Sequence, residues 1–252
     1  MEKSYYKNYF VLEKTHWLFR IRKKIFISFI QKYSSVGSKL FDFGCGSGYL
    51  IGELQKMGYD AYGTDFEKEA IDYGVNSGIK NLMLGSGDRI AYSDGTFDLV
   101  TAFDVLEHLE NERPTVTELV RVLKPGGKII FTVPAYEWLW GVQDDVSRHF
   151  RRYTEKSLIK VFKNFPELTI IRKTYFNTFL FPPIAVVRLI SRWFNIKGRQ
   201  SDFEINNPFL DAIFYSIFNL EFYFLKLINF PFGVSIILIL EKNDSHIEKN
   251  KF

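Results

Sequence analysis

Short apolar stretches alternate with amphipathic segments along most of the chain. The stretch 39–43 is apolar and ends at a glycine-rich turn, as expected of a buried β-strand. Ahead of it, Trp17, Ile21 and Ile25 recur at steps of four, which is typical of an amphipathic helix. The same patterns predict strands at 39–43, 59–64, 81–84, 97–102, 128–133, 168–175 and 234–240, and helices at 13–33, 49–57, 67–77, 113–123, 154–164, 178–195 and 208–229.

The order of these elements predicts the fold class. Strands and helices alternate up to residue 133, which favours a parallel sheet with helices on both faces. Two apolar helical stretches, joined by the polar link 197–207, then precede the last strand. We therefore expect an N-terminal helical lid at 1–35, a core at 36–175 and 234–242, an apolar helical insertion at 176–233 and a charged tail at 243–252.

Composition narrows the class of protein. Apolar residues make up 46% of the chain, which is enough for a full core and excludes a disordered polypeptide. The net charge of +4, from 33 basic and 29 acidic residues, gives no indication of a nucleic-acid partner. Cys45 is the single cysteine, which excludes an internal disulfide and a cysteine-based zinc site, and no metal site is expected.

Targeting signals are not expected. Residues 1–10 are polar and aromatic and lack the apolar region of a secretory signal. Apolar stretches after residue 175 are interrupted by charges such as Arg188 and Glu221, so none reaches the ~18–20 residues of a bilayer span. We expect a cytoplasmic protein, and peripheral contact with the inner face of a membrane stays open.

The turn after the first strand has the composition of a nucleoside-binding loop. Glycines at 44, 46 and 48 let the backbone turn sharply and approach a ligand, next to the N–H groups of a helix. A dinucleotide fingerprint would need glycine where Tyr49 stands. Asp65, at the end of the second strand, can accept hydrogen bonds from ribose hydroxyls. The alternative is a tight turn followed by a helix that Asp65 caps.

These residues open a series that resembles the class I S-adenosylmethionine-dependent methyltransferases. The motifs stand in the expected order at 40–48, 63–65, 85–88, 97–109 and 119–127, and together they cover 38–134. The resemblance implies a Rossmann-like, doubly wound, mostly parallel seven-stranded sheet with an antiparallel last strand, an N-terminal helical lid and a helical insertion before that strand. It also implies S-adenosylmethionine as cofactor and S-adenosylhomocysteine as product.

The resemblance further implies a set of cofactor contacts. The methionine part would lie near the glycine loop, the ribose on Asp65, and the adenine between Phe66 and the turn after the third strand. Many members carry an acidic residue where Ser86 stands, so here the adenine amino group is expected to meet Asp88 or a backbone carbonyl. The implied contacts are Trp17, Arg20, Gly44, Cys45, Gly46, Asp65, Phe66, Ser86, Gly87, Asp88, Phe103, Asp104 and Val105.

The flanking segments resemble a narrower bacterial and archaeal group associated with glycan or lipid-linked sugar pathways. The features that carry this are His16-Trp17, the segment 133–140 and the segment 149–153. They imply a small-molecule, glycan or lipid-linked acceptor, with a hydroxyl as one candidate for the methylated group. The residues expected to contact it are His16, Arg148, Arg151, Arg152 and Tyr153.

Two histidines are the candidate catalytic residues. His149 lies beyond the fifth strand, where this fold places its acceptor pocket, and a histidine there could take a proton from a hydroxyl near neutral pH. His108 is the second candidate base. It directly follows Glu107, so in a helix their side chains are expected to diverge. The alternatives are a histidine that only fixes its loop and a transfer that needs no base.

The apolar region at 178–229 leaves two interpretations. Its aromatic and aliphatic residues either pack against the protein's own core or a partner subunit, or lie in a membrane interface with arginines facing lipid headgroups. Two further functions compete with methyl transfer: an NAD(P)-dependent Rossmann oxidoreductase, and a non-catalytic nucleoside-binding scaffold at the membrane. The pattern gives no indication of the oligomeric state.

Overall fold

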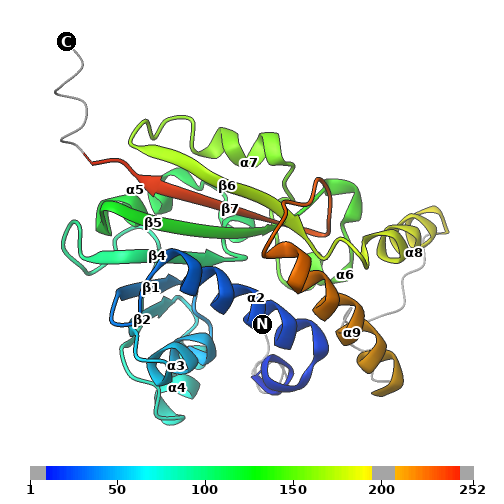
Figure 1. Cartoon of the computed structure of the whole chain (residues 1–252), viewed down its shortest axis with the longest axis horizontal. Helices are drawn as coiled ribbons and strands as arrows, with labels where there is room; N and C mark the ends of the chain where they lie inside the picture. Colours follow the sequence, from blue (N-terminus) through cyan, green and yellow to red (C-terminus); the bar gives the residue numbers. More distant parts are fainter. Residues whose placement is uncertain (1–9, 195–207, 245–252) are drawn as a thin grey trace.

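The apolar strands of the core form one seven-stranded sheet in the computed structural model, which describes residues 10–194 and 208–244 (Figure 1). In spatial order the strands are β3 (Leu82–Leu84), β2 (Asp60–Asp65), β1 (Lys39–Phe43), β4 (Phe97–Phe103), β5 (Leu123–Pro134), β7 (Ser235–Lys242) and β6 (Leu168–Phe176). Strand β7 runs antiparallel to both of its neighbours, and the pairings from β3 to β5 are parallel. The predicted Rossmann-like sheet with its antiparallel last strand is confirmed.

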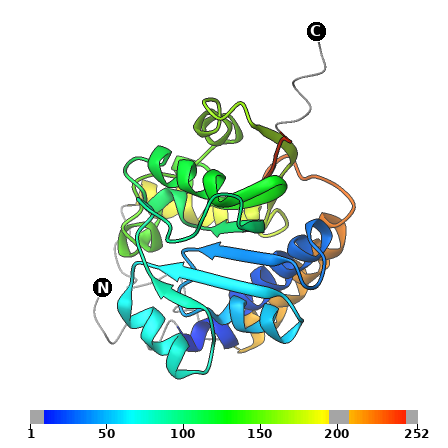
Figure 2. The ribbon, with the colours of Figure 1, turned by 90° about the vertical axis from the view of Figure 1, so that its left-hand side faces the viewer.

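Helices lie on both sides of this sheet (Figure 2). The predicted ones appear as α2 (Trp17–Tyr33), α3 (Tyr49–Lys56), α4 (Lys68–Asn76), α5 (Arg113–Val122), α7 (Glu155–Val161), α8 (Phe181–Trp193) and α9 (Pro208–Leu225). Three short elements that the sequence pattern did not predict are η1 (Leu106–His108), η2 (Glu137–Leu139) and α6 (Val142–Val146). These three lie between β4 and β7 in the chain and contribute to the wall of the site described below.

The predicted and observed bounds of several elements differ by a few residues, and two of these differences have a clear structural cause. The helix expected at 13–33 is interrupted at His16, whose extended backbone (ψ 135°) caps the start of α2, so residues 10–15 form a separate helical segment. Strand β5 begins at Leu123 rather than at Lys128, because residues 124–127 form an irregularity within the strand and not a loop before it. The link 197–207 and most of the predicted tail lie outside the described residues.

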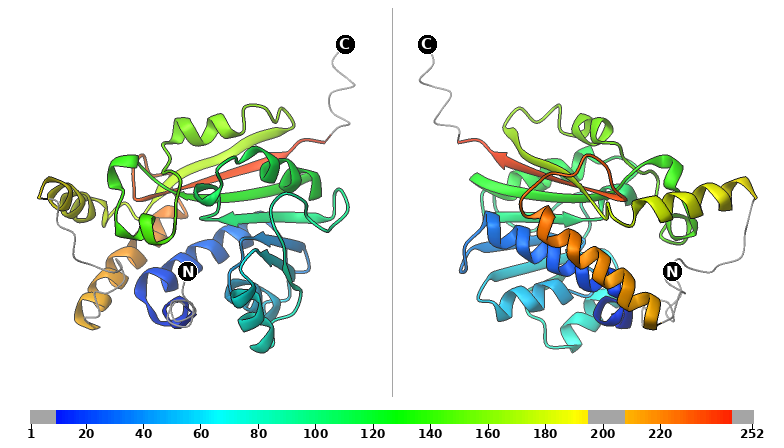
Figure 3. Two further views of the ribbon diagram at one scale, coloured as in Figure 1. Left: turned by 180° about the vertical axis from the view of Figure 1, so that it is seen from behind. Right: turned by 45° about the vertical axis from the view of Figure 1, so that its right-hand side comes forward.

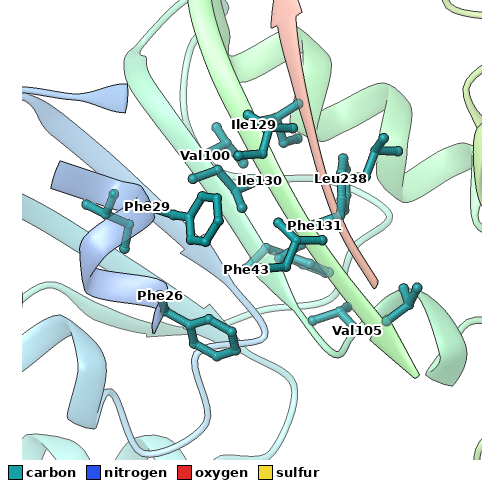
Figure 4. Packing of buried hydrophobic residues seen from close by; sticks show 14 of the residues in the cluster. Phe26, Phe29, Phe43, Val100, Val105, Ile129, Ile130, Phe131 and Leu238 are labelled. Atoms are coloured by element: carbon teal, nitrogen blue, oxygen red, sulfur yellow. The ribbon is translucent and has the colours of Figure 1, made fainter. Parts of the chain in front are cut away.

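Helix α2 is part of the core. Its Phe26 and Phe29 face a cluster that includes Val100 of β4 and Ile130 and Phe131 of β5 (Figure 4). One face of α2 is therefore buried, and within the described part of the expected lid the segment 10–15 contacts the glycine loop through Glu13 and Ser47. The division of the chain into lid, core, insertion and tail stays a prediction.

The two insertion helices differ in how they pack. Helix α9 lies beside α2, with the Trp17 and Phe214 rings 5.4 Å apart and Lys24 Nζ 2.7 Å from Asn219 Oδ1 (Figure 3). Helix α8 extends away from the sheet, and Ala185 is the one buried residue within it (Figure 3). Among the described residues, no helix combines the length and the apolar character needed to cross a membrane.

Candidate active site

One large cleft opens at the carboxyl ends of the parallel strands. Its volume is about 2540 Å³, well above the roughly 300–1,000 Å³ of a single small-molecule site. The loops after β1, β2, β3, β4 and β5 all line it, and so do residues of the N-terminal segment and of α8. Open α/β sheets bind ligands at this edge, and here the cleft has room for two reactants side by side.

The glycine loop has a backbone that other residues would strain. Gly44 has φ +77°, and a Cβ there would lie 2.5 Å from Val105 Cγ2. Gly48 has φ +71°, and a Cβ there would lie 2.7 Å from the Leu82 side chain. The loop is tied down by the backbone N–H of Gly44, which donates to the Thr64 carbonyl at 2.8 Å. These glycines therefore let the loop lie close to its neighbours and leave its backbone open to a ligand.

Asp65 connects this loop to the next helix. Its Oδ2 accepts the Gly46 N–H at 2.8 Å, and its Oδ1 accepts the Glu67 N–H at 2.9 Å. Burial raises the pKa of Asp65, and the two backbone donors oppose that rise. The side chain is 8% exposed and lines the cleft, so its remaining lone pairs are available to a hydroxyl donor.

A second wall carries the segments predicted to hold an adenine. Phe66 is 66% exposed and lines the cleft, and Ser86, Gly87 and Asp88 line it as well. A Cβ on Gly87 would lie 2.4 Å from Thr115 Oγ1, so this turn also needs glycine. Cys45 lines the cleft but is buried, and burial raises the pKa of its thiol well above the usual value. It is therefore a small apolar residue of the wall.

Two acidic residues beside the glycine loop were not among the site residues expected from the sequence. Glu13 Oε2 accepts a hydrogen bond from Ser47 Oγ at 2.7 Å, which places residues 10–15 against the glycine loop. Asp42 Oδ1 accepts one from Thr101 Oγ1 at 2.6 Å. Burial raises the pKa of each carboxyl group to about 7. A cationic ligand group beside the loop would favour their ionised forms. Asp42 stands within the first motif, whereas Glu13 carries no local signal.

Segment 103–105 joins the cleft to α2. The rings of Phe103 and Phe26 are stacked with their centroids 3.9 Å apart. Asp104 adopts φ +54°, a left-handed conformation that is uncommon outside glycine, although aspartate adopts it more readily than most residues, and that clusters at functional sites. Its carboxylate forms an ion pair with the Arg22 guanidinium and accepts a hydrogen bond from Thr132 Oγ1 at 3.0 Å. Phe103, Asp104 and Val105 all line the cleft, as the resemblance implied.

The two candidate catalytic histidines lie together. The ring centroids of His108 and His149 are 4.6 Å apart, and both residues line the cleft. His149 Nδ1 lies 2.8 Å from Asp144 Oδ1, and Arg152 makes two further hydrogen bonds to this buried carboxylate. Burial and the neighbouring His149 lower the pKa of His108 to about 4. His108 is therefore a weak proton acceptor at neutral pH.

The predicted basic cluster is divided by the structure. Arg148 is exposed and lines the cleft, whereas the guanidinium of Arg152 is held by Asp144. Arg151 Nη1 lies 2.7 Å from Glu112 Oε1, and the Tyr153 hydroxyl donates to the same carboxylate at 2.9 Å. Neither Arg151 nor Tyr153 is among the residues that line the cleft. Arg148 is thus the member of the set best placed to meet an anionic group.

The N-terminal candidates are separated as well. His16 caps α2 by accepting the Leu18 N–H on Nδ1 at 3.3 Å, and it lines the cleft with Trp17. Arg20 is exposed and does not line the cleft, and its guanidinium lies 4.5 Å from the centre of the Tyr215 ring. His16 stands before the helix rather than within it, and it lines the cleft whereas Arg20 does not.

Residues 41–131 match a family described as "Methyltransferase domain". Proteins named ubiquinone biosynthesis O-methyltransferase are similar over this region. That of Methylococcus capsulatus is 33% identical over 116 residues, or 42% of this chain and 48% of that protein. That of Vibrio parahaemolyticus is 31% identical over 102 residues, or 38% of this chain and 43% of that protein. The chain therefore spans about half the length of the curated relatives that it matches.

Solved structures share the whole architecture at low identity. A chain of the complex between the Haloferax volcanii Trm112 methyltransferase activator and a candidate methyltransferase has a TM-score of 0.61, 16% identity and 96% coverage of both chains. A TehB-like S-adenosylmethionine-dependent methyltransferase from Corynebacterium glutamicum has a TM-score of 0.57 and 16% identity, and the match covers 96% of this chain and 97% of that chain. The [4+2]-cyclase SpnF has a TM-score of 0.57 and 16% identity, and the match covers 86% of this chain and 80% of that chain. At this identity the likeness shows the fold alone, which also hosts other reactions.

Proposed function

We propose that this chain, whose residues 41–131 match the methyltransferase domain family and whose sheet has the class I methyltransferase fold, is an S-adenosylmethionine-dependent methyltransferase. The observation that carries the proposal is the glycine loop tied to Asp65 inside the matched region, opening onto a cleft with room for a second reactant. The family match favours this function over an NAD(P)-dependent oxidoreductase, and so does Tyr49 in the place of a fingerprint glycine.

The residues around the loop fit this cofactor. Gly44 and Gly46 would bring the backbone close to the methionine part of the cofactor. The carboxyl groups of Glu13 and Asp42 lie beside the loop, where they would face the ammonium group of that methionine part. Asp65 accepts from the ribose. The adenine would lie between Phe66 and residues 86–88, and Trp17 also lines the cleft. When bound, the cofactor supplies a methyl group on a cationic sulfur, and the chain orients the acceptor in line with it and excludes water.

The acceptor that the cleft suits best is an amphiphile methylated on a hydroxyl. Apolar side chains from the segment 138–140 and from α8 line the cleft, among them Trp138, Trp140, Ile184 and Val187. The relatives named as O-methyltransferases support an oxygen acceptor. We propose a lipid-linked molecule, a glycan carrier among the candidates, whose apolar part lies along α8 while its hydroxyl faces the histidines. The prediction that one of these histidines removes the hydroxyl proton stays a prediction.

Calorimetry and turnover together test the function. We expect the purified protein to bind S-adenosylhomocysteine and to give no heat with NAD. Incubated with S-adenosylmethionine, it should release S-adenosylhomocysteine when a lipid extract of cells is added, and less with the aqueous extract. Binding of NAD alone would favour the oxidoreductase. Binding of S-adenosylhomocysteine without turnover on either extract would favour the non-catalytic scaffold.

The exposed apolar face of α8 supports contact with an anionic lipid surface. Trp193 is 86% exposed, and more than half of the surface of Val186 and of Leu189 is exposed. Helix α8 contains two arginines, both of which line the cleft, and no acidic residue, so its net positive charge favours anionic headgroups. Aromatic side chains flanked by arginine are typical of helices that lie in a membrane interface. This face would bring the mouth of the cleft to a lipid-linked acceptor.

Co-sedimentation with vesicles tests this contact. We expect the protein to sediment with vesicles of anionic phospholipid, and the double variant Leu189→Ser/Trp193→Ser to remain in the supernatant, because burying two such side chains contributes about 3 kcal/mol or more. Val36→Ser is a control, since Val36 is 66% exposed and lies in the turn between α2 and β1 rather than on α8. Unchanged affinity for S-adenosylhomocysteine shows that the variants are folded. Equal sedimentation of all three proteins would contradict the proposal.

A further inference from the structure

Three polar side chains meet on one wall of the cleft. Glu107 and His108 belong to η1, and His149 follows α6. Each offers one ligand atom, and these atoms all lie within 4.8 Å of one another. Glu107 and His108 therefore do not diverge as their adjacent positions suggested. We propose that Glu107, His108 and His149 bind one divalent metal ion of the zinc class.

Glu107 is the strongest reason for a cation at this place. Its side chain is fully buried, and neither carboxylate oxygen receives a hydrogen bond from another residue. The two other acidic groups nearby have arginine partners, Asp104 with Arg22 and Asp144 with Arg152. Glu107 forms no ion pair among the described residues. A buried carboxylate is unfavourable without a counter-charge, which a metal ion would supply.

His149 is held in the way that metal ligands usually are. It uses Nδ1 toward the Asp144 carboxylate, which leaves Nε2 to bind. Metal-binding histidines almost always donate their second N–H to a carboxylate or a carbonyl, which fixes the tautomer and the ring orientation. The His108 ring packs edge-on against the His149 ring, with the centroids 4.6 Å apart, and one of its nitrogens is among the converging ligand atoms.

Two histidines and one carboxylate form a ligand set of catalytic zinc sites, in which further positions stay open. All three residues line the cleft, so an open position would face the acceptor. The role that follows rests on the proposed function. An acceptor hydroxyl bound to the ion would lose its proton to water in the cleft more readily, and its oxygen would keep the electron pair with which it attacks the methyl carbon. The methyl–sulfur bond would break in the same step, and the sulfur would keep that bond's electrons as neutral S-adenosylhomocysteine. His149 would then be a metal ligand and not the proton acceptor.

Direct metal binding tests the proposal without any acceptor. Tag-free protein is dialysed against a chelator, then titrated with ZnCl₂ by calorimetry, and its metal content is measured after gel filtration. We expect one zinc ion per chain and a higher melting temperature with zinc. Glu107→Gln and His149→Ala should each weaken zinc binding by at least about 10–100-fold. Glu107→Gln removes the buried charge at constant shape, so the variant is expected to fold.

Glu110→Gln is the control, because Glu110 is an exposed acid that lines the same cleft. It should bind zinc as the unaltered chain does. The proposal is overturned if the chain binds no zinc, or if both Glu107→Gln and His149→Ala bind it with unchanged affinity. Affinity for S-adenosylhomocysteine, measured in chelator, separates these outcomes from a failure of the methyltransferase function. A protein that binds the nucleoside but no zinc keeps the function and loses the metal site.

Discussion

Replacing Asp65 with alanine is expected to weaken binding of S-adenosylhomocysteine by at least about 100-fold, which corresponds to about 2.8 kcal/mol. The carboxylate holds the N–H groups of Gly46 and Glu67, and hydrogen bonds to charged groups contribute about 1.5–3 kcal/mol each. Without it the glycine loop loses its tie to α4, and the ribose loses its acceptor. Calorimetry on the variant and on the unaltered chain measures the difference.

Asp60→Ala provides the comparison for this experiment. Asp60 lies at the opposite end of the same strand, is exposed, and does not line the cleft. Its variant should bind S-adenosylhomocysteine within about threefold of the unaltered chain, a difference below 1 kcal/mol. If Asp65→Ala bound the nucleoside equally well, Asp65 would act only as a helix cap, and the proposed cofactor site would be wrong.

Asp144→Ala is expected to lower the free energy of unfolding by about 3–5 kcal/mol, the usual effect of removing one partner of a buried ion pair. Asp144 is fully buried and accepts hydrogen bonds from Arg152, His149 and the backbone N–H of Gly141. Arg152 retains one bond to the Ala135 carbonyl, but its charge would stay buried without a counter-charge. Urea denaturation in the presence of a chelator measures the change without any contribution from metal.

The adjacent Asp145 gives the matched variant. It is exposed and accepts one hydrogen bond from the Trp140 indole at 2.9 Å. Asp145→Ala should therefore change the free energy of unfolding by less than about 1 kcal/mol. Equal destabilisation by the two variants would contradict this prediction. It would show that the buried hydrogen bonds of Asp144, including the one to His149, do not stabilise the fold.

Local pattern was sufficient for most of the sheet. Strand β1 coincides with its predicted bounds, because an apolar run followed by Gly44 specifies both the strand and its end. The start of β5 was missed because residues 124–127, with Pro125 and two glycines, have the composition of a loop. Whether such a segment ends a strand or bulges from it depends on pairing with β4, which is not a local property.

The site was predictable in part for the same reason. Residues that follow strand ends reach the cleft wherever the strands are parallel, so the positions of Asp65 and Phe103 follow from the motif order. Glu13 could not be found in this way, because its bond to Ser47 depends on the break at His16 and on the path of the N-terminal segment. The convergence of Glu107 with His149 likewise needs the short helices η1 and α6, which lack a readable periodicity.

The position of β7 has a consequence for how the chain is synthesised. This strand is the last of the described ones to leave the ribosome, yet it pairs on one side with β5 and on the other with β6. A nascent chain that ends before residue 235 therefore presents two unpaired strand edges at once, and such edges readily recruit strands from other chains. The eight residues of β7 therefore complete the sheet. Until β7 has been synthesised, the edges of β5 and β6 must be shielded in another way if the nascent chain is not to aggregate.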